Sequence, residues 1–374
     1  MRILVVDPQA YTPPYDHALC AALAARGLEV ELTTARFLHG RAPEPEGYRR
    51  DLAFGPLAGS LVARSPRSPA RVPLKLAGHL RGLAELVRRS RRSAPDVIHW
   101  QWAPFPRADL RALRSARAGA TVFTAHDVLP RRSAEAIPLW RELYGACDRV
   151  IVHSHASRDR LLLEVGGIGA DRVAVVPHAL FDDLRPVERT PQPAATILFF
   201  GLIRPDKGLD VLIEALPGVP GARLEVVGSP RMAIEPLQER ARALGLEERI
   251  RWDLRFVDDA TRDAAFARAS VVCLPYRWIE GSGVLATALA RGVPVVTTSV
   301  GSFPELCAAY DLGSPVSPED PAELARALGE MLADGPVRSA ALAGIERSRR
   351  ELTWERVALQ TEQLYREALD EQRA

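Results

Sequence analysis

The chain has 374 residues, of which 47% are hydrophobic and 26% are charged. This length and composition predict a soluble globular protein with two domains of ordinary size, each with enough apolar residues for a buried core. The formal net charge of +2 at pH 7 indicates no particular partner, and we expect no nucleic-acid binding.

Cysteine usage and the N-terminus both indicate a cytoplasmic protein. The four cysteines lie far apart and form no CxxC pair, so we interpret them as small buried hydrophobes in a reducing cytosol. The N-terminus opens as a strand rather than a signal region, and no run of about 18 apolar residues suggests a membrane span. We expect no metal site, because the chain has no convincing DxD motif or His/Cys cluster.

The first elements predict a β-α-β unit. Residues 3–6 form a continuous apolar run, which is typical of a parallel strand covered on both faces. After a proline-containing loop, Asp16 can cap a helix that ends at Gly27, and a second strand follows at 29–34. The turn after the first strand lacks GxGxxG, which argues against a dehydrogenase.

A basic stretch follows at residues 64–92. It carries nine Arg or Lys residues and one acidic residue, Glu85, with leucines at roughly helical spacing. Such a helix can lie on an anionic membrane surface, so we expect peripheral membrane contact as one interpretation. A solvated helix face packed on the sheet is the alternative.

Aromatic and histidine side chains follow the next strands, at 97–99 and 121–124. Trp100 and Trp102 come after the first of these strands, and His126 after the second. Open α/β sheets bind ligands at the carboxyl ends of their strands, so these residues are candidates for a ligand cleft. Core packing remains the alternative for the tryptophans.

Residues 186–195 are polar and rich in proline, which predicts an interdomain linker. The β-α alternation then restarts, so the sequence predicts a second doubly wound unit and a small-molecule site in the cleft between the two. The strands of this second unit are expected at 196–200, 223–227, 249–252, 271–274 and 294–298.

Two strand ends of the second unit carry residues suited to a diphosphate. Arg204 and Lys207 follow the strand that ends at Gly201, and two cations at this spacing can embrace a pyrophosphate. The strand at 271–274 leads into a glycine loop and a helix, whose N-terminal amides also favour anions. That loop comprises Glu280, Gly281, Ser282 and Gly283, with Val284 next in the helix.

Several motifs resemble those of the retaining glycosyltransferases of family 4, which have the GT-B fold. They lie at residues 201–215, 279–298, 300–306, 315–328 and 353–369, with weaker matches at the strand ends of the first half. The resemblance implies two Rossmann-like domains that face a central cleft. They would be an acceptor-side domain at 1–188 and a nucleotide-sugar domain at 189–352, with a closing helix at 354–370 packed back on the first.

The resemblance also implies roles for individual residues. Arg204 and Lys207 match the pair that grips the donor pyrophosphate, and Glu280 matches the first glutamate of the E-x7-E motif, which contacts the donor sugar. His126 matches a histidine at the reaction centre. Residues 201, 204, 207 and 280–284 would then bind the donor, and His126, Arg204, Lys207 and Glu280 would be catalytic.

Two positions depart from the family pattern. Ala288 stands where the second glutamate of E-x7-E usually holds the nucleotide ribose. The usual Gly-Gly after the first strand is replaced by Pro14-Tyr15-Asp16, which suggests side-chain contacts from Tyr15 and Asp16 to the acceptor. Trp100 and Trp102 are the other acceptor-side candidates.

The implied reaction is retaining transfer of a sugar from a UDP- or GDP-sugar to an acceptor hydroxyl, without a cofactor or metal. The product would be a polysaccharide, a glycolipid or a natural product. Two alternatives stay open: a non-catalytic protein that binds nucleotide sugars, and a sugar-nucleotide epimerase.

Overall fold

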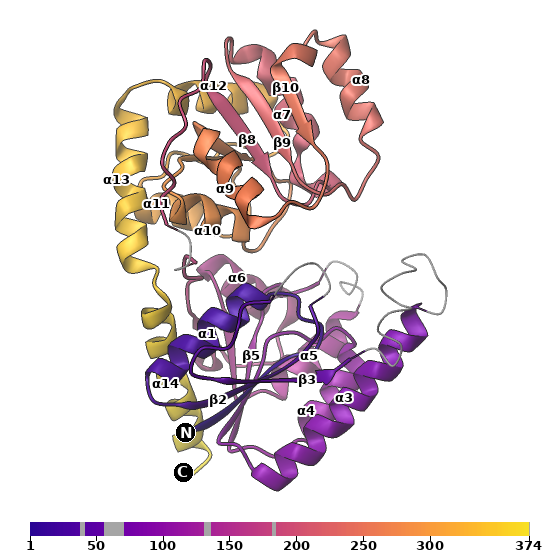
Figure 1. Ribbon diagram of the computed structural model, residues 1–374. Coiled ribbons are helices and arrows are strands. Elements are labelled where there is room, and N and C mark those ends of the chain that lie inside the picture. The colour runs from indigo at the N-terminus through magenta and orange to yellow at the C-terminus, as the bar shows by residue number, and fades with distance from the viewer. Residues whose placement is uncertain (38–41, 56–70, 131–135, 182–184, 374) are drawn as a thin grey trace. The chain divides into compact units, whose positions relative to one another are not determined.

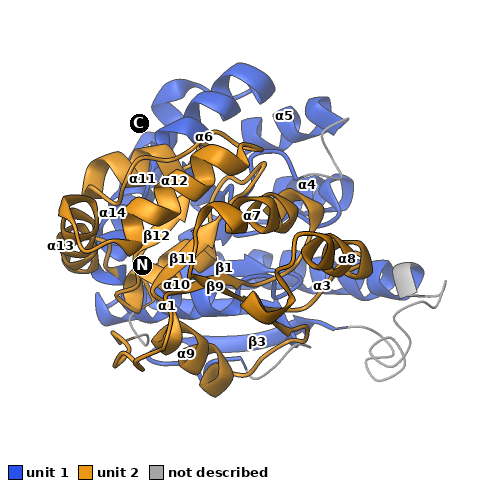
Figure 2. Cartoon of the chain, turned by 90° about the horizontal axis from the view of Figure 1, so that it is seen from above, with its two compact units in different colours: residues 1–177, 354–374 blue, residues 178–353 orange. Residues whose placement is uncertain are grey.

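The computed structural model describes residues 1–37, 42–55, 71–130, 136–181 and 185–373. The chain forms two compact units, of which unit 1 comprises residues 1–177 with 354–374 and unit 2 comprises residues 178–353 (Figure 2). Each unit is built on one parallel sheet, so the expectation of two doubly wound α/β domains is confirmed. Within the described ranges, no helix combines the length and apolar character needed to cross a bilayer.

The sheet of unit 1 has seven strands in the order β3-β2-β1-β4-β5-β6-β7. Figure 1 labels β2, β3 and β5 of this sheet. The order reverses between β1 and β4, which places a topological switch point at the carboxyl ends of these two strands. The edge strand β3 was not predicted, because its sequence RRDLAF is too polar to give a strand pattern. The strands are β1 (Arg2–Asp7), β2 (Glu29–Ala35), β3 (Arg49–Phe54), β4 (Val97–Trp100), β5 (Ala120–Thr124), β6 (Arg149–Val152) and β7 (Val173–Val175).

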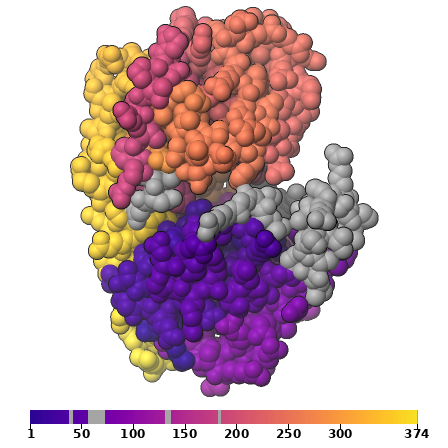
Figure 3. Space-filling view, in the orientation of Figure 1, coloured from indigo at the N-terminus to yellow at the C-terminus, as the bar shows by residue number. Residues whose placement is uncertain are grey.

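Helices cover both faces of this sheet. One face carries α1 and α14, which pack against each other, and the apolar cluster on the other face includes residues of α3, α4 and α5. Residues near the N-terminus, drawn in indigo, form a large part of the visible surface of unit 1 (Figure 3). The helices are α1 (Pro13–Ala25), α3 (Arg71–Ser93), α4 (Pro106–Ser115), α5 (Ile137–Gly145), α6 (His155–Arg160) and α14 (Trp354–Glu371).

The start of α1 corrects the sequence analysis. Asp16 was expected to cap this helix, but α1 begins at Pro13, after an N-cap position at Thr12. Proline is well tolerated in the first helical turn, where its missing N–H has no partner to lose. Asp16 therefore lies inside the helix, where its side chain is buried.

The last helix, α14, is held on unit 1 by polar as well as apolar contacts. Arg26 Nε donates to Glu362 Oε2 at 2.5 Å, and Arg149 pairs with Glu371. The Tyr365 hydroxyl lies 2.6 Å from Nδ1 of His99 in β4. The C-terminal segment is thus part of unit 1, although the chain passes through unit 2 before reaching it.

The five strands of unit 2 have the order β10-β9-β8-β11-β12, with a switch point between β8 and β11. One face carries the apolar cluster of α7, α8 and α12, and the other that of α9, α10, α11 and α13. The strands are β8 (Thr196–Phe200), β9 (Arg223–Val227), β10 (Ile250–Asp253), β11 (Val271–Leu274) and β12 (Val295–Thr297). The helices are α7 (Leu209–Ala215), α8 (Glu235–Ala243), α9 (Asp259–Arg268), α10 (Gly283–Ala290), α11 (Phe303–Tyr310), α12 (Pro321–Leu332) and α13 (Pro336–Glu351).

The proline-rich segment 186–195 is not a free linker. The division between the units falls at residues 177 and 178, before this segment. Val187 N donates to the Arg291 carbonyl at 3.2 Å, and Thr190 N donates to the Ala267 carbonyl at 3.0 Å. These backbone bonds hold the segment on unit 2, and local composition alone gives no signal for them.

Candidate active site

The switch point of unit 2 brings together the loops that follow β8 and β11. Gly208, in the first loop, has a φ of +66°, and a Cβ built on it would lie 1.8 Å from the carbonyl oxygen of Pro275 in the second loop. Only glycine fits this close backbone approach. The two loops are therefore packed together, as a common site at this edge of the sheet requires.

The predicted cation pair lies in the first of these loops. Arg204 is extended, and Pro205–Lys207 form a single 3-10 turn that leads into α7. Arg204 Nε lies 3.2 Å from Asp206 Oδ1, and Lys207 Nζ lies 3.9 Å from Asp206 Oδ2. Two cations thus share one carboxylate, which leaves the group with one net positive charge for an anion.

Lys207 is the more deeply placed cation. Its side chain is 11% exposed, and its Nζ lies 3.7 Å from the centroid of the buried Tyr276 ring. Such a cation–π contact holds the ammonium in place without neutralising its charge. The Tyr276 hydroxyl hydrogen-bonds to Ser282, so the same tyrosine links Lys207 to the start of α10.

Arg277 stabilises the loop that follows β8 through bonds to Asp210 and Pro205. Its guanidinium binds the Asp210 carboxylate through two bonds, of 2.9 and 2.6 Å, and donates to the Pro205 carbonyl at 2.6 Å. Partial burial raises the pKa of Asp210, but the Arg277 bonds outweigh it and the net shift is downward. Arg277 was not singled out from the sequence, because its partners lie far from it along the chain.

The second loop presents the predicted sugar-side residues. Ser282 caps α10, with its Oγ accepting from Leu285 N at 3.2 Å, and Glu280 is buried at 5% exposure. A Cβ built on Gly281 or Gly283 would meet no heavy atom within 4 Å, so a ligand has room beside this backbone. The N–H groups in the first turn of α10 suit an anion.

Ala288, the position of the missing second glutamate, lies inside α10. Its side chain is 0% exposed and belongs to the apolar cluster of α9, α10, α11 and α13. A carboxylate here would lose its hydration to that core, which is costly for an unpaired charge. The alanine is therefore a core residue and supplies no polar contact to a ribose.

The carboxyl ends of β5 and β6 in unit 1 hold a pair of histidines. Nε2 of His126 lies 2.9 Å from Oε1 of Gln101, and Nδ1 of His126 lies 3.2 Å from Nε2 of His153. Nδ1 of His153 donates to the Val176 carbonyl at 2.9 Å. His153 and Gln101 were not named as site residues, although both follow strand ends beside His126.

Two aromatic rings fix the orientation of His126. Trp102 stacks on it with a centroid distance of 4.8 Å and an interplanar angle of 14°, and Tyr15 meets it edge-on at 4.6 Å. Tyr15 is 3% exposed, and Trp102 Nε1 donates to Thr12 Oγ1 at 3.1 Å. Both of these acceptor-side candidates therefore position His126 in this structure.

The other two acceptor-side candidates are buried. Trp100 lies in β4 with 1% exposure, so it is a core residue and offers no surface to an acceptor. All four residues of β4 are buried, as expected for a strand whose sheet is covered on both faces. Asp16 is 1% exposed and hydrogen-bonds to Asp7 at the end of β1.

Behind this site, a neutral histidine ties β4 to α14. His99 Nε2 lies 2.7 Å from Thr124 Oγ1, and its Nδ1 bonds to Tyr365. Burial, with a smaller contribution from the nearby His153, lowers the pKa of His99 to about 3. His99 therefore stays uncharged at neutral pH and serves as a structural hydrogen-bonding group.

Comparison with known families gives two matches that together cover most of the chain. Residues 15–181 match the model described as Glycosyltransferase Family 4, and residues 194–334 match Glycosyl transferases group 1. A phosphatidyl-myo-inositol mannosyltransferase of Mycobacterium leprae is 31% identical over 72% of this chain and 73% of its own. A D-inositol 3-phosphate glycosyltransferase of Streptomyces scabiei is 28% identical over 95% of this chain and 86% of its own.

Solved structures show the same fold at low identity. A sucrose-phosphate synthase from Thermosynechococcus elongatus has a TM-score of 0.79 at 20% identity, covering 99% of this chain and 100% of its own. Anabaena HepE, solved with UDP and glucose, has a TM-score of 0.73 at 19% identity, covering 97% of this chain and 98% of its own. At these identities the likeness concerns the fold alone.

Proposed function

The chain belongs to the group 1 glycosyl transferases of family 4, and from this premise we propose that it moves a sugar from a nucleotide-diphosphate sugar to an acceptor hydroxyl with retention of configuration. Membership makes it a glycosyltransferase, and its two parallel-sheet units have the GT-B fold. The observation that carries the proposal is the convergence of Arg204, Lys207 and the start of α10 at the switch point of unit 2.

We assign the donor pyrophosphate to this convergence. Arg204 can bind a phosphate bidentately and Lys207 acts as a point charge, while the free space beside Gly281 and Gly283 leaves room for the phosphates and sugar. Glu280 then receives the sugar hydroxyls. A UDP- or GDP-sugar is the proposed donor, and HepE, which was solved with UDP-glucose, supports the former.

The proposed chemistry needs no covalent nucleophile and no metal. The bond between the anomeric carbon and the phosphate oxygen breaks as the acceptor oxygen bonds to that carbon on the same face. The acceptor proton passes to the departing phosphate oxygen. Arg204, Lys207 and the α10 amides stabilise the negative charge that develops on the phosphate. The rest of the rate enhancement comes from the positioning of donor and acceptor.

Unit 1 is the proposed acceptor side. His126, held by Gln101, His153, Trp102 and Tyr15, faces the transferred sugar in this assignment.

We also propose peripheral contact with anionic membranes through α3. Residues 64–70 of the basic stretch lie outside the described residues, and within α3 Arg88 and Arg89 form ion pairs with acidic neighbours. The exposed Arg81, Arg91 and Arg92 carry that proposal.

A thermal-shift screen of nucleotide sugars tests the donor assignment. At least one nucleotide sugar should raise the melting temperature, since a ligand that binds only the folded state stabilises it. Glu280→Gln should reduce the shift given by that nucleotide sugar and spare the shift given by the matching nucleoside diphosphate. Equal reductions for both ligands would contradict the assignment of Glu280 to the sugar.

A non-catalytic nucleotide-sugar-binding protein is the second candidate, favoured by the buried Ala288 where the ribose contact is usually made. A glycosyltransferase transfers the sugar to an acceptor, whereas a non-catalytic protein only binds the nucleotide sugar. Sugar transfer to any acceptor removes the second candidate, and NMR of the product tests retention, because the new bond should keep the anomeric configuration of the donor.

A further inference from the structure

Two buried carboxyl groups lie together in unit 1 and take no part in the proposed reaction. Asp7 is the last residue of β1 and is 0% exposed, and Asp16 in α1 is 1% exposed. Their side chains hydrogen-bond to each other. Because an ionised carboxylate can only accept, such a bond requires that one of the two groups holds a proton.

The surroundings of the two groups place the proton on Asp16. Asp7 accepts the backbone N–H groups of Gln9 at 3.1 Å and Tyr11 at 2.8 Å, which favours its charged form. Oδ1 of Asp16 is buried and makes no hydrogen bond with the described residues, so a negative charge there would be uncompensated. Burial raises the pKa of Asp16 well above its usual range, and the charge of Asp7 raises it further.

The Asp7 carboxylate organises the loop between β1 and α1. Besides its bonds to Gln9 and Tyr11, its Oδ2 lies 3.5 Å from the backbone N of Thr12. Within this loop Ala10 has a φ of +49°, in the left-handed region that residues other than glycine rarely adopt. Such a conformation persists only where the surrounding structure holds it, and the bonds to Asp7 do so on both sides of Ala10.

Thr12 connects this loop to His126. Its Oγ1 accepts from Trp102 Nε1 at 3.1 Å, and its hydroxyl also interacts with the Asp16 carboxyl group. Trp102 in turn stacks on the ring of His126, and Tyr15, the residue before Asp16, meets the same ring edge-on. Both aromatic rings that orient His126 are therefore attached to the segment that the carboxyl pair holds.

The other buried titratable groups around the pair are neutral at neutral pH. Burial raises the pKa values of three tyrosines and a cysteine there and lowers that of one histidine. These residues are Tyr15 and Cys20 on α1, Tyr48 before β3, Tyr365 on α14 and His99 on β4. None of them can compensate a second negative charge at the pair.

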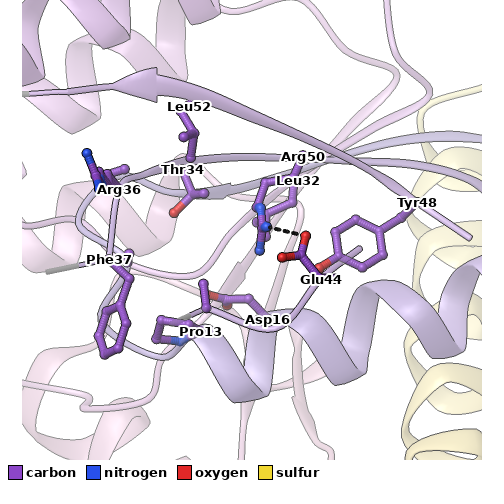
Figure 4. Close-up of a pocket in the computed structure, with 13 residues that line it drawn as sticks. Pro13, Asp16, Leu32, Thr34, Arg36, Phe37, Glu44, Tyr48, Arg50 and Leu52 are labelled. Atoms are coloured by element: carbon purple, nitrogen blue, oxygen red, sulfur yellow. Dashed lines mark ion pairs between the residues drawn. The ribbon is translucent and has the colours of Figure 1, made fainter. Parts of the chain in front are cut away.

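The charged groups on this side of α1 lie around the cavity that Asp16 lines, between α1, β2 and β3 (Figure 4). Arg50 lies 3.7 Å from Glu44, the pair drawn with a dashed line, and Arg36 is exposed. His17 lies 3.9 Å from Glu46. Within the described part of the chain no cation forms an ion pair with Asp16, so its ionisation would place an unpaired charge beside Asp7.

We propose that the Asp7–Asp16 pair is the positioning element of His126, and that the proton held by Asp16 keeps the β1–α1 loop, Trp102 and Tyr15 in place. The inference rests on the proposed glycosyl transfer, in which His126 faces the sugar. Asp7 and Asp16 are positioning residues, because they act through Thr12 and the two aromatic rings. Loss of the proton brings two buried negative charges together, so the loop should move and His126 should lose its orientation.

Fluorine NMR of the full chain labelled with 5-fluorotryptophan tests this positioning without any substrate. The chain has six tryptophans, and Trp102→Phe identifies the Trp102 resonance. Asp16→Asn keeps a neutral group that can donate to Asp7, so the Trp102 resonance should stay at its wild-type position. Asp16→Leu, similar in size but without a donor, should shift it. Trp140, in the apolar cluster on the other face of the sheet, should be unchanged in both variants and reports that they are folded.

Raising the pH gives a second readout. The Trp102 resonance should move on the alkaline side in the wild type, as Asp16 loses its proton, and should not move in Asp16→Asn. Asp109→Asn is the matched control, because Asp109 is also a buried acid whose pKa is raised by burial, but it bonds to His79 and to the backbone of Phe105. This variant should keep the wild-type pH dependence. The comparison between wild type and Asp16→Asn also decides the question if Asp16→Leu does not fold.

Turnover with UDP-glucose or GDP-mannose shows whether the positioning matters for transfer. Asp16→Leu should lower kcat about tenfold or more, since misplaced groups cost rate, and Asp16→Asn should restore it. UDP and GDP affinity, a property of unit 2, should be unchanged in both variants. The proposal is overturned if Asp16→Leu keeps the wild-type Trp102 resonance, if Asp16→Asn behaves like Asp16→Leu, or if the alkaline change persists in Asp16→Asn. A wild type without turnover would contradict the proposed function, and the Trp102 resonance would still decide the positioning.

Discussion

Removing the charge of Lys207 should weaken nucleoside diphosphate binding with little effect on the fold. Lys207→Met keeps an unbranched side chain over the Tyr276 ring, which lies 3.7 Å from the ammonium in the wild type. The loss of the cation–π contact should cost about 0.5–2 kcal/mol of stability. The variant should therefore remain folded at room temperature.

The size of the binding effect follows from the surroundings of the ammonium. A hydrogen bond to a charged group contributes about 1.5–3 kcal/mol. Asp206 already lies 3.9 Å from Lys207 Nζ and partly offsets its charge, so the lower end of this range applies. About 1.4 kcal/mol corresponds to a tenfold increase in Kd. Arg204→Ala should give a similar loss.

Isothermal titration calorimetry with UDP and GDP measures the loss of affinity in Lys207→Met and in Arg204→Ala. Arg255→Ala is the control, because Arg255 pairs with Asp253 at the end of the edge strand β10 and is 60% exposed. It should bind like the wild type. If the wild type binds and both Lys207→Met and Arg204→Ala retain its affinity, the pyrophosphate does not lie at this loop.

Three further predictions concern other parts of the molecule. The raised pKa of Asp16 means that the folded state holds its proton more tightly than the unfolded state, so the free energy of unfolding should fall as the pH rises from about 4. Asp16→Asn, which mimics the protonated acid, should be more stable than the wild type at neutral pH in urea titrations; an equal pH dependence of the two proteins would refute this protonation state. Sugar transfer should persist in EDTA, and loss of activity that Mg²⁺ or Mn²⁺ restores would show that a metal takes part. Vesicles rich in anionic lipid should pull down the protein at low ionic strength, and the double substitution R91E/R92E should reduce this; unchanged sedimentation of the variant would exclude α3 as the contact.

The strands were predictable where burial on both faces leaves a continuous apolar run. Residues 3–6 and 271–274 are such runs, and both lie in central strands of the structure. The loop and helix after residue 274 were equally readable, because Ser282 caps α10 and Gly292 follows its end. The edge strand β3 lacks such a run, since it needs only one neighbouring strand and remains partly exposed.

The arrangement of the candidate site depended on contacts between distant residues. Arg204 and Lys207 were found from the sequence because they are close together in one loop, but Arg277, which braces that loop, is 73 residues after Arg204. The His126–His153 contact exists because β5 and β6 are neighbours in the sheet. Nothing local to Asp16 predicts that it shares a proton with Asp7, since that requires α1 to begin at Pro13.

The most direct test is turnover itself. Purified protein is incubated with UDP-glucose or GDP-mannose, with and without a polyol acceptor, and the nucleoside diphosphate released is quantified beside the sugar product. We predict release that the acceptor accelerates and that Arg204→Ala reduces strongly. Release that is the same in Arg204→Ala as in the wild type would contradict the assignment of the reaction to the strand ends of unit 2.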